Sequence, residues 1–234
     1  MLFRSLAARY PHNILWHVSV AGYRASLKQR EEARRELGCL AVDLTAGPRN
    51  FFWLHQMERL AEVVSFVGDV RRAAMLYDFL LPYVDRCAVV APSYSRGAVA
   101  RPLGLLATLV GRYEDAERHF EKALEMNARI RARIWVAHTQ HDYARMLVAR
   151  DEPGDREKAA ALAAQALATA HEVGMKPLEA DVLELQATAG LAEGERVAPS
   201  HESRPPSPAS AVFRRSRPSR PTLRCRAGPT IWRR

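Results

Sequence analysis

Four alanines recur along this chain at nearly constant intervals, and this periodicity limits the fold more than any other feature. Ala33, Ala73, Ala116 and Ala159 are separated by 40, 43 and 43 residues, and each lies near the start of an amphipathic segment. In these segments apolar residues return every three or four positions, which places them on one face of an α-helix. Because no such unit buries its apolar face alone, the units must stack. The sequence therefore predicts an all-α fold of about four helical hairpins, arranged as an α-solenoid.

Helix boundaries follow from local start and stop signals. Glycine is suited to ending a helix, and Gly68, Gly111 and Gly154 are each followed by a polar residue or tight turn that opens the next helix. Asn50 can cap a helix that starts one residue later, and Pro177 suits the first turn of the last helix. No convincing strand pattern is left. We expect helices at residues 14–27, 30–44, 51–67, 70–86, 94–110, 113–130, 132–150, 155–173 and 177–191.

Small residues mark where the two helices of each hairpin are expected to touch. A larger side chain at these positions would hold the helix axes apart. The bulkier Tyr77 and Phe120 are then expected to fill the space between one hairpin and the next, each burial contributing about 1.5–3 kcal/mol. The facing pairs are Ala21 with Ala33, Ala61 with Ala73, Gly104 with Ala116, and Ala144 with Ala159.

The third hairpin resembles a tetratricopeptide repeat (TPR). It reads Leu103-Gly104, then Gly111-Arg112-Tyr113, then Ala116-x-x-x-Phe120-x-x-Ala123-Leu124. The resemblance implies a TPR-like helical repeat domain over residues 10–193, in which the hairpins form a right-handed α-solenoid. The repeats exceed the usual length of about 34 residues, the Trp of the first helix is absent from its usual place, and the closing Pro is missing. We expect longer helices or loops to absorb the excess.

A wider set of segments resembles the helical repeat region in the C-terminal part of large bacterial signalling proteins. Those proteins carry a signal-transducing ATPase, joined in some to an adenylate or guanylate cyclase domain and in others to a LuxR-type DNA-binding transcriptional regulator domain. The resemblance implies a role in signal transduction or transcriptional control, and a chain that is a fragment of a longer ancestor. The sequence holds no G-x-x-x-x-G-K-[ST] phosphate loop and no cyclase module. The segments are residues 34–37, 60–63, 73–83, 111–116 and 141–147.

Positive charge is concentrated at the C-terminal end. The net charge is +9, but residues 195–234 hold ten Arg and only two acidic residues, so the rest of the chain is nearly neutral. Seven of the 14 prolines lie in the same stretch, and no helical pattern continues there. We place a boundary near Gly194 and expect residues 194–234 to be a disordered tail, which out-of-frame translation of a G+C-rich gene would explain. Its arginines suggest an alternative function, salt-sensitive and non-specific nucleic-acid binding.

Composition also bears on compartment. No window holds the roughly 18 to 20 apolar residues that a spanning helix needs, and the opening segment is too short in apolar residues for a signal peptide. Cys39, Cys87 and Cys225 are far apart and form no C-x-x-C pair, so neither a disulfide framework nor a zinc site is expected. The sequence predicts a cytoplasmic protein without a membrane partner. Apolar residues on the terminal helices, such as Trp16 and Leu183, suggest self-association.

Candidate chemistry is sparse. His138-x-x-His141, with Asp142 beside it, has a spacing compatible with metal ligation, but no third ligand accompanies it in a motif, so we expect no metal and no cofactor. No Gly-x-Ser-x-Gly elbow or nucleophilic Cys motif occurs. We expect a protein that is not an enzyme, with the remnant of a nucleotide cyclase or ATPase polypeptide as the third alternative. The isolated His119 and His171 are expected to face solvent.

The candidate binding residues come from the repeat register. First-helix positions of such arrays usually line a concave groove, and here they give a mixed-charge groove with one aromatic side chain. We expect it to hold a peptide or a helix of a partner protein. The alternative is that these positions are simply solvated. The groove residues are His55, Glu58, Glu62, Phe66, Arg101, His138, His141 and Arg145.

Overall fold

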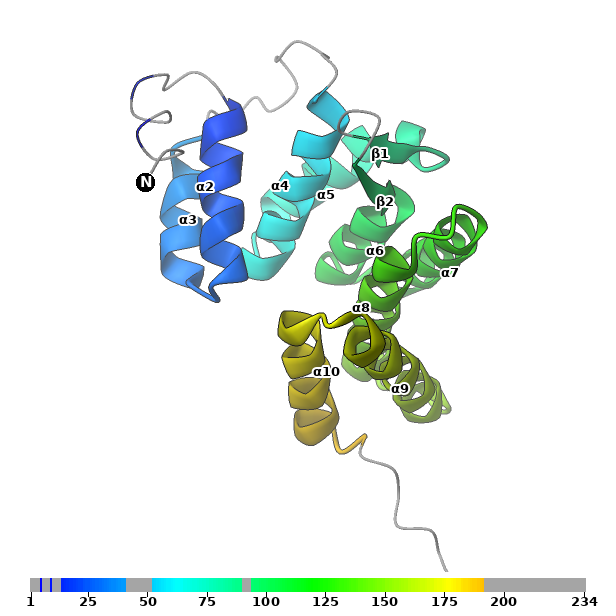
Figure 1. The fold of residues 1–234 in the computed structure, drawn as a ribbon. Coiled ribbons are helices and arrows are strands. Elements are labelled where there is room, and N and C mark those ends of the chain that lie inside the picture. The colour runs from blue at the N-terminus through cyan, green and yellow to red at the C-terminus, as the bar shows by residue number, and fades with distance from the viewer. Residues whose placement is uncertain (1–4, 6–8, 10–13, 41–51, 90–93, 192–234) are drawn as a thin grey trace, which may run out of the picture. The chain divides into compact units, whose positions relative to one another are not determined.

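The computed structural model describes residues 5, 9, 14–40, 52–89 and 94–191, and most of these described residues are helical (Figure 1). This confirms the predicted all-α class. The helices are α2 (Ile14–Ser26), α3 (Arg30–Gly38), α4 (Trp53–Val67), α5 (Val70–Leu80), α6 (Ala100–Leu109), α7 (Tyr113–Arg129), α8 (Arg133–Arg150), α9 (Asp155–Val173) and α10 (Lys176–Ala189). The predicted tail, residues 194–234, lies outside the described residues, as does the expected cap Asn50.

Several helix ends lie where the sequence signals predicted them. Gly68 ends α4 in the left-handed conformation, with its amide donating to the carbonyl of Val64 at 2.9 Å. Asp69 then caps α5, because its side chain accepts a hydrogen bond from the amide of Arg72 at 3.0 Å. Pro177 lies in the first turn of α10.

The prediction that no strand is present is wrong. Strands β1 (Cys87–Val89) and β2 (Ser95–Ala98) pair antiparallel between α5 and α6. The helix predicted to reach residue 86 ends at Leu80, where a 3-10 turn over Leu81–Tyr83 begins, because Pro82 has no amide hydrogen to continue an α-helix. The helix predicted from residue 94 starts at Ala100, since Gly97 has a φ of +82°, which no α-helix contains.

The small residues predicted at the hairpin contacts are buried, and one of them makes a close approach. A Cβ atom at Gly104 in α6 would lie 2.7 Å from a ring carbon of Phe120 in α7, so only glycine permits this approach. Tyr77 and Phe120 are buried between hairpins, with the phenol of Tyr77 3.0 Å from Nε2 of His119 and the ring of Phe120 stacked on Tyr143. The prediction for His119 is wrong, since this contact buries it. All seven alanines predicted at the hairpin contacts are completely buried: Ala21, Ala33, Ala61, Ala73, Ala116, Ala144 and Ala159.

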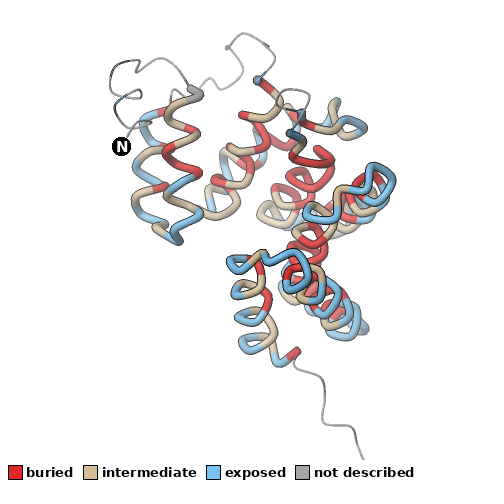
Figure 2. Tube along the Cα trace, viewed as in Figure 1, coloured by how far each residue is buried: buried red, intermediate tan, exposed pale blue. Residues whose placement is uncertain are grey.

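Each helix from α2 to α10 contacts the next one in the chain, and the even-numbered helices also contact one another in order. The second set of contacts joins α2 to α4, α4 to α6, α6 to α8, and α8 to α10. Figure 2 shows buried positions concentrated in α6 and in the middle of α8, which have neighbours on several sides. The helices α2, α4, α6, α8 and α10 therefore form a continuous row, which we call the first-helix row.

No helix in the described ranges is long and apolar enough to cross a membrane.

Candidate functional site

The β1–β2 hairpin brings polar side chains to the first-helix row, and α7 and α8 hold it in place. The Asn127 side-chain oxygen accepts a hydrogen bond from the amide of Ala98 at 2.9 Å, and the Trp135 indole donates to the carbonyl of Ser95 at 2.8 Å. A Cβ atom at Gly97 would lie within 3 Å of both Asn127 and Trp135, so the close packing of the hairpin on α7 and α8 requires glycine at this position. The hairpin thereby fixes the position of Arg96, whose guanidinium lies 5.0 Å from the centre of the Trp135 ring.

Two arginines and two carboxylates form an ion-pair cluster across four elements. Glu62 in α4 accepts hydrogen bonds from Arg96 in β2 and, at 2.7 Å, from Arg101 in α6. Arg101 also donates through Nε to Asp142 in α8 at 2.8 Å. Because every member bonds to another, charges that would be costly to bury singly are paired. We refer to Glu62, Arg96, Arg101 and Asp142 as the ion-pair cluster.

The pairing determines the ionisation of the cluster. Burial alone would raise the pKa of Glu62, but the charges of Arg96 and Arg101 hold it at about 2. The pKa of Asp142 is also lowered, against the effect of burial, by Arg101 and by a hydrogen bond from His141. Both carboxylates are therefore ionised at neutral pH.

Glu58 lies beside this cluster but does not join it. Glu58 is 3% exposed, neither carboxyl oxygen has a hydrogen-bond partner among the described residues, and Oε2 lies 3.8 Å from Nε of Arg96. Burial raises the pKa of Glu58 well above its ordinary value, and the negative charge of Glu62 adds to the rise. A carboxyl group in this setting favours its neutral form.

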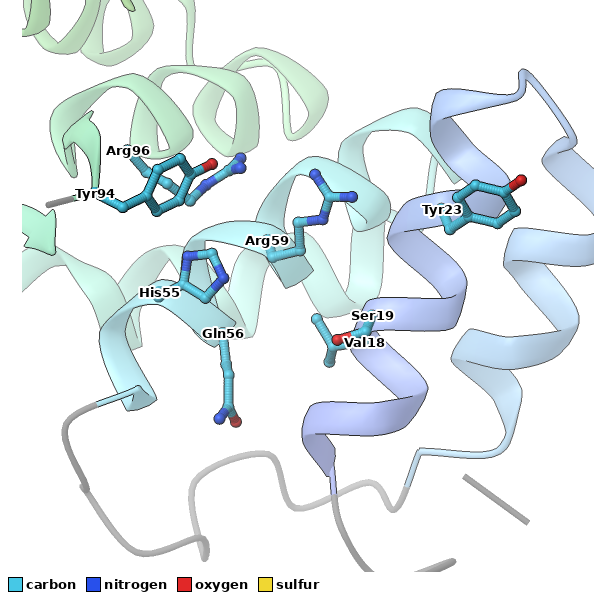
Figure 3. A pocket seen from close by; sticks show the side chains of 8 residues that line it. All are labelled: Val18, Ser19, Tyr23, His55, Gln56, Arg59, Tyr94 and Arg96. Atoms are coloured by element: carbon cyan, nitrogen blue, oxygen red, sulfur yellow. The ribbon is translucent and has the colours of Figure 1, made fainter. Parts of the chain in front are cut away.

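A pocket of about 320 Å³ lies next to the cluster, between α2, α4 and the hairpin (Figure 3). Tyr23 and Tyr94 at its edge are about half exposed. Burial and the charges of Arg96 and Arg59 lower the pKa of His55 to about 4, so its imidazole is neutral at physiological pH. The lining residues are Val18, Ser19, Tyr23, His55, Gln56, Arg59, Tyr94 and Arg96.

The predicted groove residues are divided by their exposure. Glu58, Arg101 and His141 are each less than a tenth exposed, so the alternative that all eight positions are solvated is wrong for these three. Arg145 is exposed, and the remaining four are partly buried. The guanidinium carbon of Arg30 lies over the Phe66 ring, 5.5 Å from the centre of that ring. Partner binding through these residues stays a prediction. The partly buried four are His55, Glu62, Phe66 and His138.

Two parts of the cluster were missed at the level of sequence. The helix predicted over residues 94–110 contains Arg96, and the sequence singles out Asp142 only as a neighbour of His141. The sequence does hold one signal. The helix predicted over residues 132–150 has an apolar stripe of Val136, Tyr143, Ala144 and Leu147, and Asp142 lies directly beside Tyr143. A charged residue at the edge of such a stripe is often paired when it is buried.

Ion pairs also connect a residue just after α2 with α10, the last helix of the first-helix row. Nζ of Lys28, just after α2, lies 2.6 Å from Glu184 and 3.0 Å from Asp181, both in α10. These side chains are well exposed to solvent, so the pairs contribute at most about 1 kcal/mol each. They place the first and last helices of the row within reach of a single side chain.

Nowhere in the described part of the chain do three or more His, Cys, Asp or Glu side chains group as ligands for a metal ion. Burial, together with the charge of Arg101, lowers the pKa of His138 to about 4, and His141 is directed to Asp142 rather than toward a shared centre with it. Comparisons of the whole chain with models of protein families, with curated proteins and with solved structures find no match.

Proposed function

We propose that this protein is a non-catalytic protein-interaction module in which TPR-like helical hairpins stack as a right-handed solenoid and the first-helix row carries the binding surface. The observation behind this proposal is the pattern of helix contacts. Each helix packs on its successor, and α2, α4, α6, α8 and α10 also contact one another in order. A stack of hairpins gives this pattern, because every hairpin buries its apolar face on the next.

The exposed charges of the row suggest what the partner looks like. Arg145 in α8 lies close enough to Glu184 in α10 to help lower the pKa of that carboxyl, although Lys28 contributes more. A positive and a negative group therefore lie near one another on the α8–α10 part of the row. A partner segment with mixed charge, presented as an extended peptide or as a helix, complements such a surface.

In the wider context, we propose that the module belongs to a bacterial signalling protein or transcriptional regulator. The support is the resemblance of its repeats to the corresponding region of those proteins. The partner would then be another domain of that signalling system.

Affinity capture with variants of the full chain tests the interaction function. Arg145→Glu reverses an exposed charge on the first-helix row, whereas Arg71→Glu reverses an exposed charge on α5, outside the row. Proteins captured from a cell extract are identified by mass spectrometry with each bait. We expect a protein that is retained by the wild type and by Arg71→Glu and lost with Arg145→Glu. Identical capture by all three chains would contradict binding through the row.

A further inference from the structure

We propose that the pocket between α2, α4 and the β1–β2 hairpin binds a small organic monocarboxylate, with the carboxylate on Arg59 and the apolar body against Val18, Tyr23 and Tyr94. This ligand is separate from the protein partner proposed above. The volume of about 320 Å³ is within the range of small-molecule sites.

Arg59 is held in the pocket without a close partner. Its nearest carboxylate is Glu62, 3.8 Å from its Nη1, and its side chain forms no hydrogen bond with any residue that the structure describes. Gly22 in α2 provides the room for it, because a Cβ atom there would lie 2.4 Å from Nε of Arg59. The guanidinium therefore lies directly on the backbone of α2, with 31% of the side chain exposed. Its donors are available to a ligand that enters the pocket.

The charges around the pocket favour a ligand with one negative charge. Within the ion-pair cluster, the cations Arg96 and Arg101 are balanced by the carboxylates Glu62 and Asp142. Arg59 is left as the excess positive charge, since the neighbouring Glu58 is buried without hydrogen bonds and favours its neutral form. One guanidinium matches one carboxylate in charge and in bidentate geometry. A dianionic phosphate would leave a negative charge unmatched.

The other lining groups suit the remainder of such a ligand. Nδ1 of His55 is buried and has no hydrogen-bond partner in the part of the chain that the structure describes, so it can pair with a ligand oxygen. The His55 and Tyr94 rings lie edge to face with centres 6.4 Å apart, and Tyr94 and Tyr23 come from opposite sides of the pocket (Figure 3). The aromatic or branched aliphatic body of the ligand would contact the rings of Tyr94 and Tyr23, and this contact would remove part of its apolar surface from water.

Isothermal titration calorimetry of the full chain tests the proposal with two probe acids, benzoate and 3-phenylpropanoate. Benzamide and 3-phenylpropanamide serve as neutral controls of the same shape, and inorganic phosphate tests the charge argument. We expect at least one acid to bind at least tenfold more tightly than its amide and than phosphate, because the amide lacks the charge-assisted pair with Arg59 and phosphate carries a negative charge that stays unmatched. No binding of either acid, equal binding of acid and amide, or preference for phosphate would overturn the proposal.

Two variants locate the site. Arg59→Gln removes the cation, and Gly22→Ala keeps every charge but places a methyl group where the guanidinium lies. We expect each to weaken binding of the acid by at least tenfold, whereas Arg71→Gln on α5 leaves it unchanged. Circular dichroism of each variant verifies the helical content, and Gly22→Ala is a helix-favouring change. Unchanged affinity in both pocket variants would overturn the assignment.

Discussion

Nε of Arg101 in α6 donates a hydrogen bond to Oδ2 of Asp142 in α8 across 2.8 Å, although the two residues are 41 positions apart in the chain. Both side chains are less than a tenth exposed. The contact links the third and fourth helical hairpins at the level of the β1–β2 hairpin, and through Glu62 it extends to the second. The charged residues of the first helices thus hold the hairpins together in addition to any role in binding.

Replacement of Asp142 by Ala is expected to destabilise the protein strongly. The change leaves Arg101 buried with one of its two carboxylate partners missing, and breaking a buried pair in this way costs about 3–5 kcal/mol. Urea unfolding at neutral pH measures the free energy of unfolding. The control Glu125→Ala changes an exposed acid on α7 and is expected to stay within about 0.5 kcal/mol of the wild type. Equal effects of the two substitutions would contradict the structural role of the pair.

The raised pKa of Glu58 predicts that its contribution to the free energy of unfolding decreases as the pH rises, whereas the contribution of a carboxylate in an ordinary buried ion pair increases. Because its pKa is raised in the folded state, its contribution to stability is complete below its unfolded pKa and is lost as the pH rises through the folded pKa. Glu58→Gln keeps the shape and cannot ionise. We expect the free energy of unfolding of Glu58→Gln to increase relative to the wild type between pH 4 and pH 9. A difference that stays constant over this range would show that Glu58 does not titrate differently on folding.

The approach of α6 to α7 predicts a sensitive position at Gly104. An alanine Cβ would lie 2.7 Å from the ring of Phe120, which is completely buried, so the ring or the helices must move. Overpacking of this kind costs about 1–3 kcal/mol. Gly38→Ala is the matched control, since nothing lies within 4 Å of its Cβ position at the end of α3. A thermal shift assay that shows Gly104→Ala to be as stable as Gly38→Ala would refute the close contact.

Local signals in the sequence predict where the helices lie, but not the end of α5, the start of α6, the β1–β2 hairpin or the ion-pair cluster. Glycines such as Gly68, and the spacing of apolar residues, depend only on neighbours in the chain. The β1–β2 hairpin depends on Asn127 and Trp135, which bond to it from α7 and α8. A short strand is stabilised by such distant partners rather than by its own propensity, so its sequence resembled the start of a helix.

The predicted groove shows the same limit. The polar first-helix positions are predicted to line a partner groove or simply to be solvated. Both interpretations need accessible side chains, which holds for Arg145 but not for Arg101 and His141. In a stack, the polar side of one helix can face the polar side of the next, and ion pairs form there. Periodicity gives the side of a helix on which a residue lies, but the neighbour on that side comes from tertiary structure.

The arginines of residues 195–234 predict a separate and simpler activity. A chain without these residues is expected to lose any binding to a mixed-sequence RNA, because ten of the chain's arginines are removed. Binding by the intact chain should weaken steeply as salt is raised. Electrophoretic mobility shifts at two salt concentrations measure both effects. Salt-insensitive binding, or binding that survives the deletion, would assign nucleic-acid recognition to the helical part instead.

The most direct test of this account is limited proteolysis of the intact chain, followed by mass spectrometry and circular dichroism of the resistant product. The central claim is that the helices from α2 to α10 form one stack in which every hairpin stabilises the next. It predicts a resistant, strongly helical fragment that ends near Leu191, with the earliest cuts C-terminal to that residue. Early cleavage inside α6, α7 or α8, at the same rate as in the C-terminal residues, would contradict a cooperative stack of hairpins.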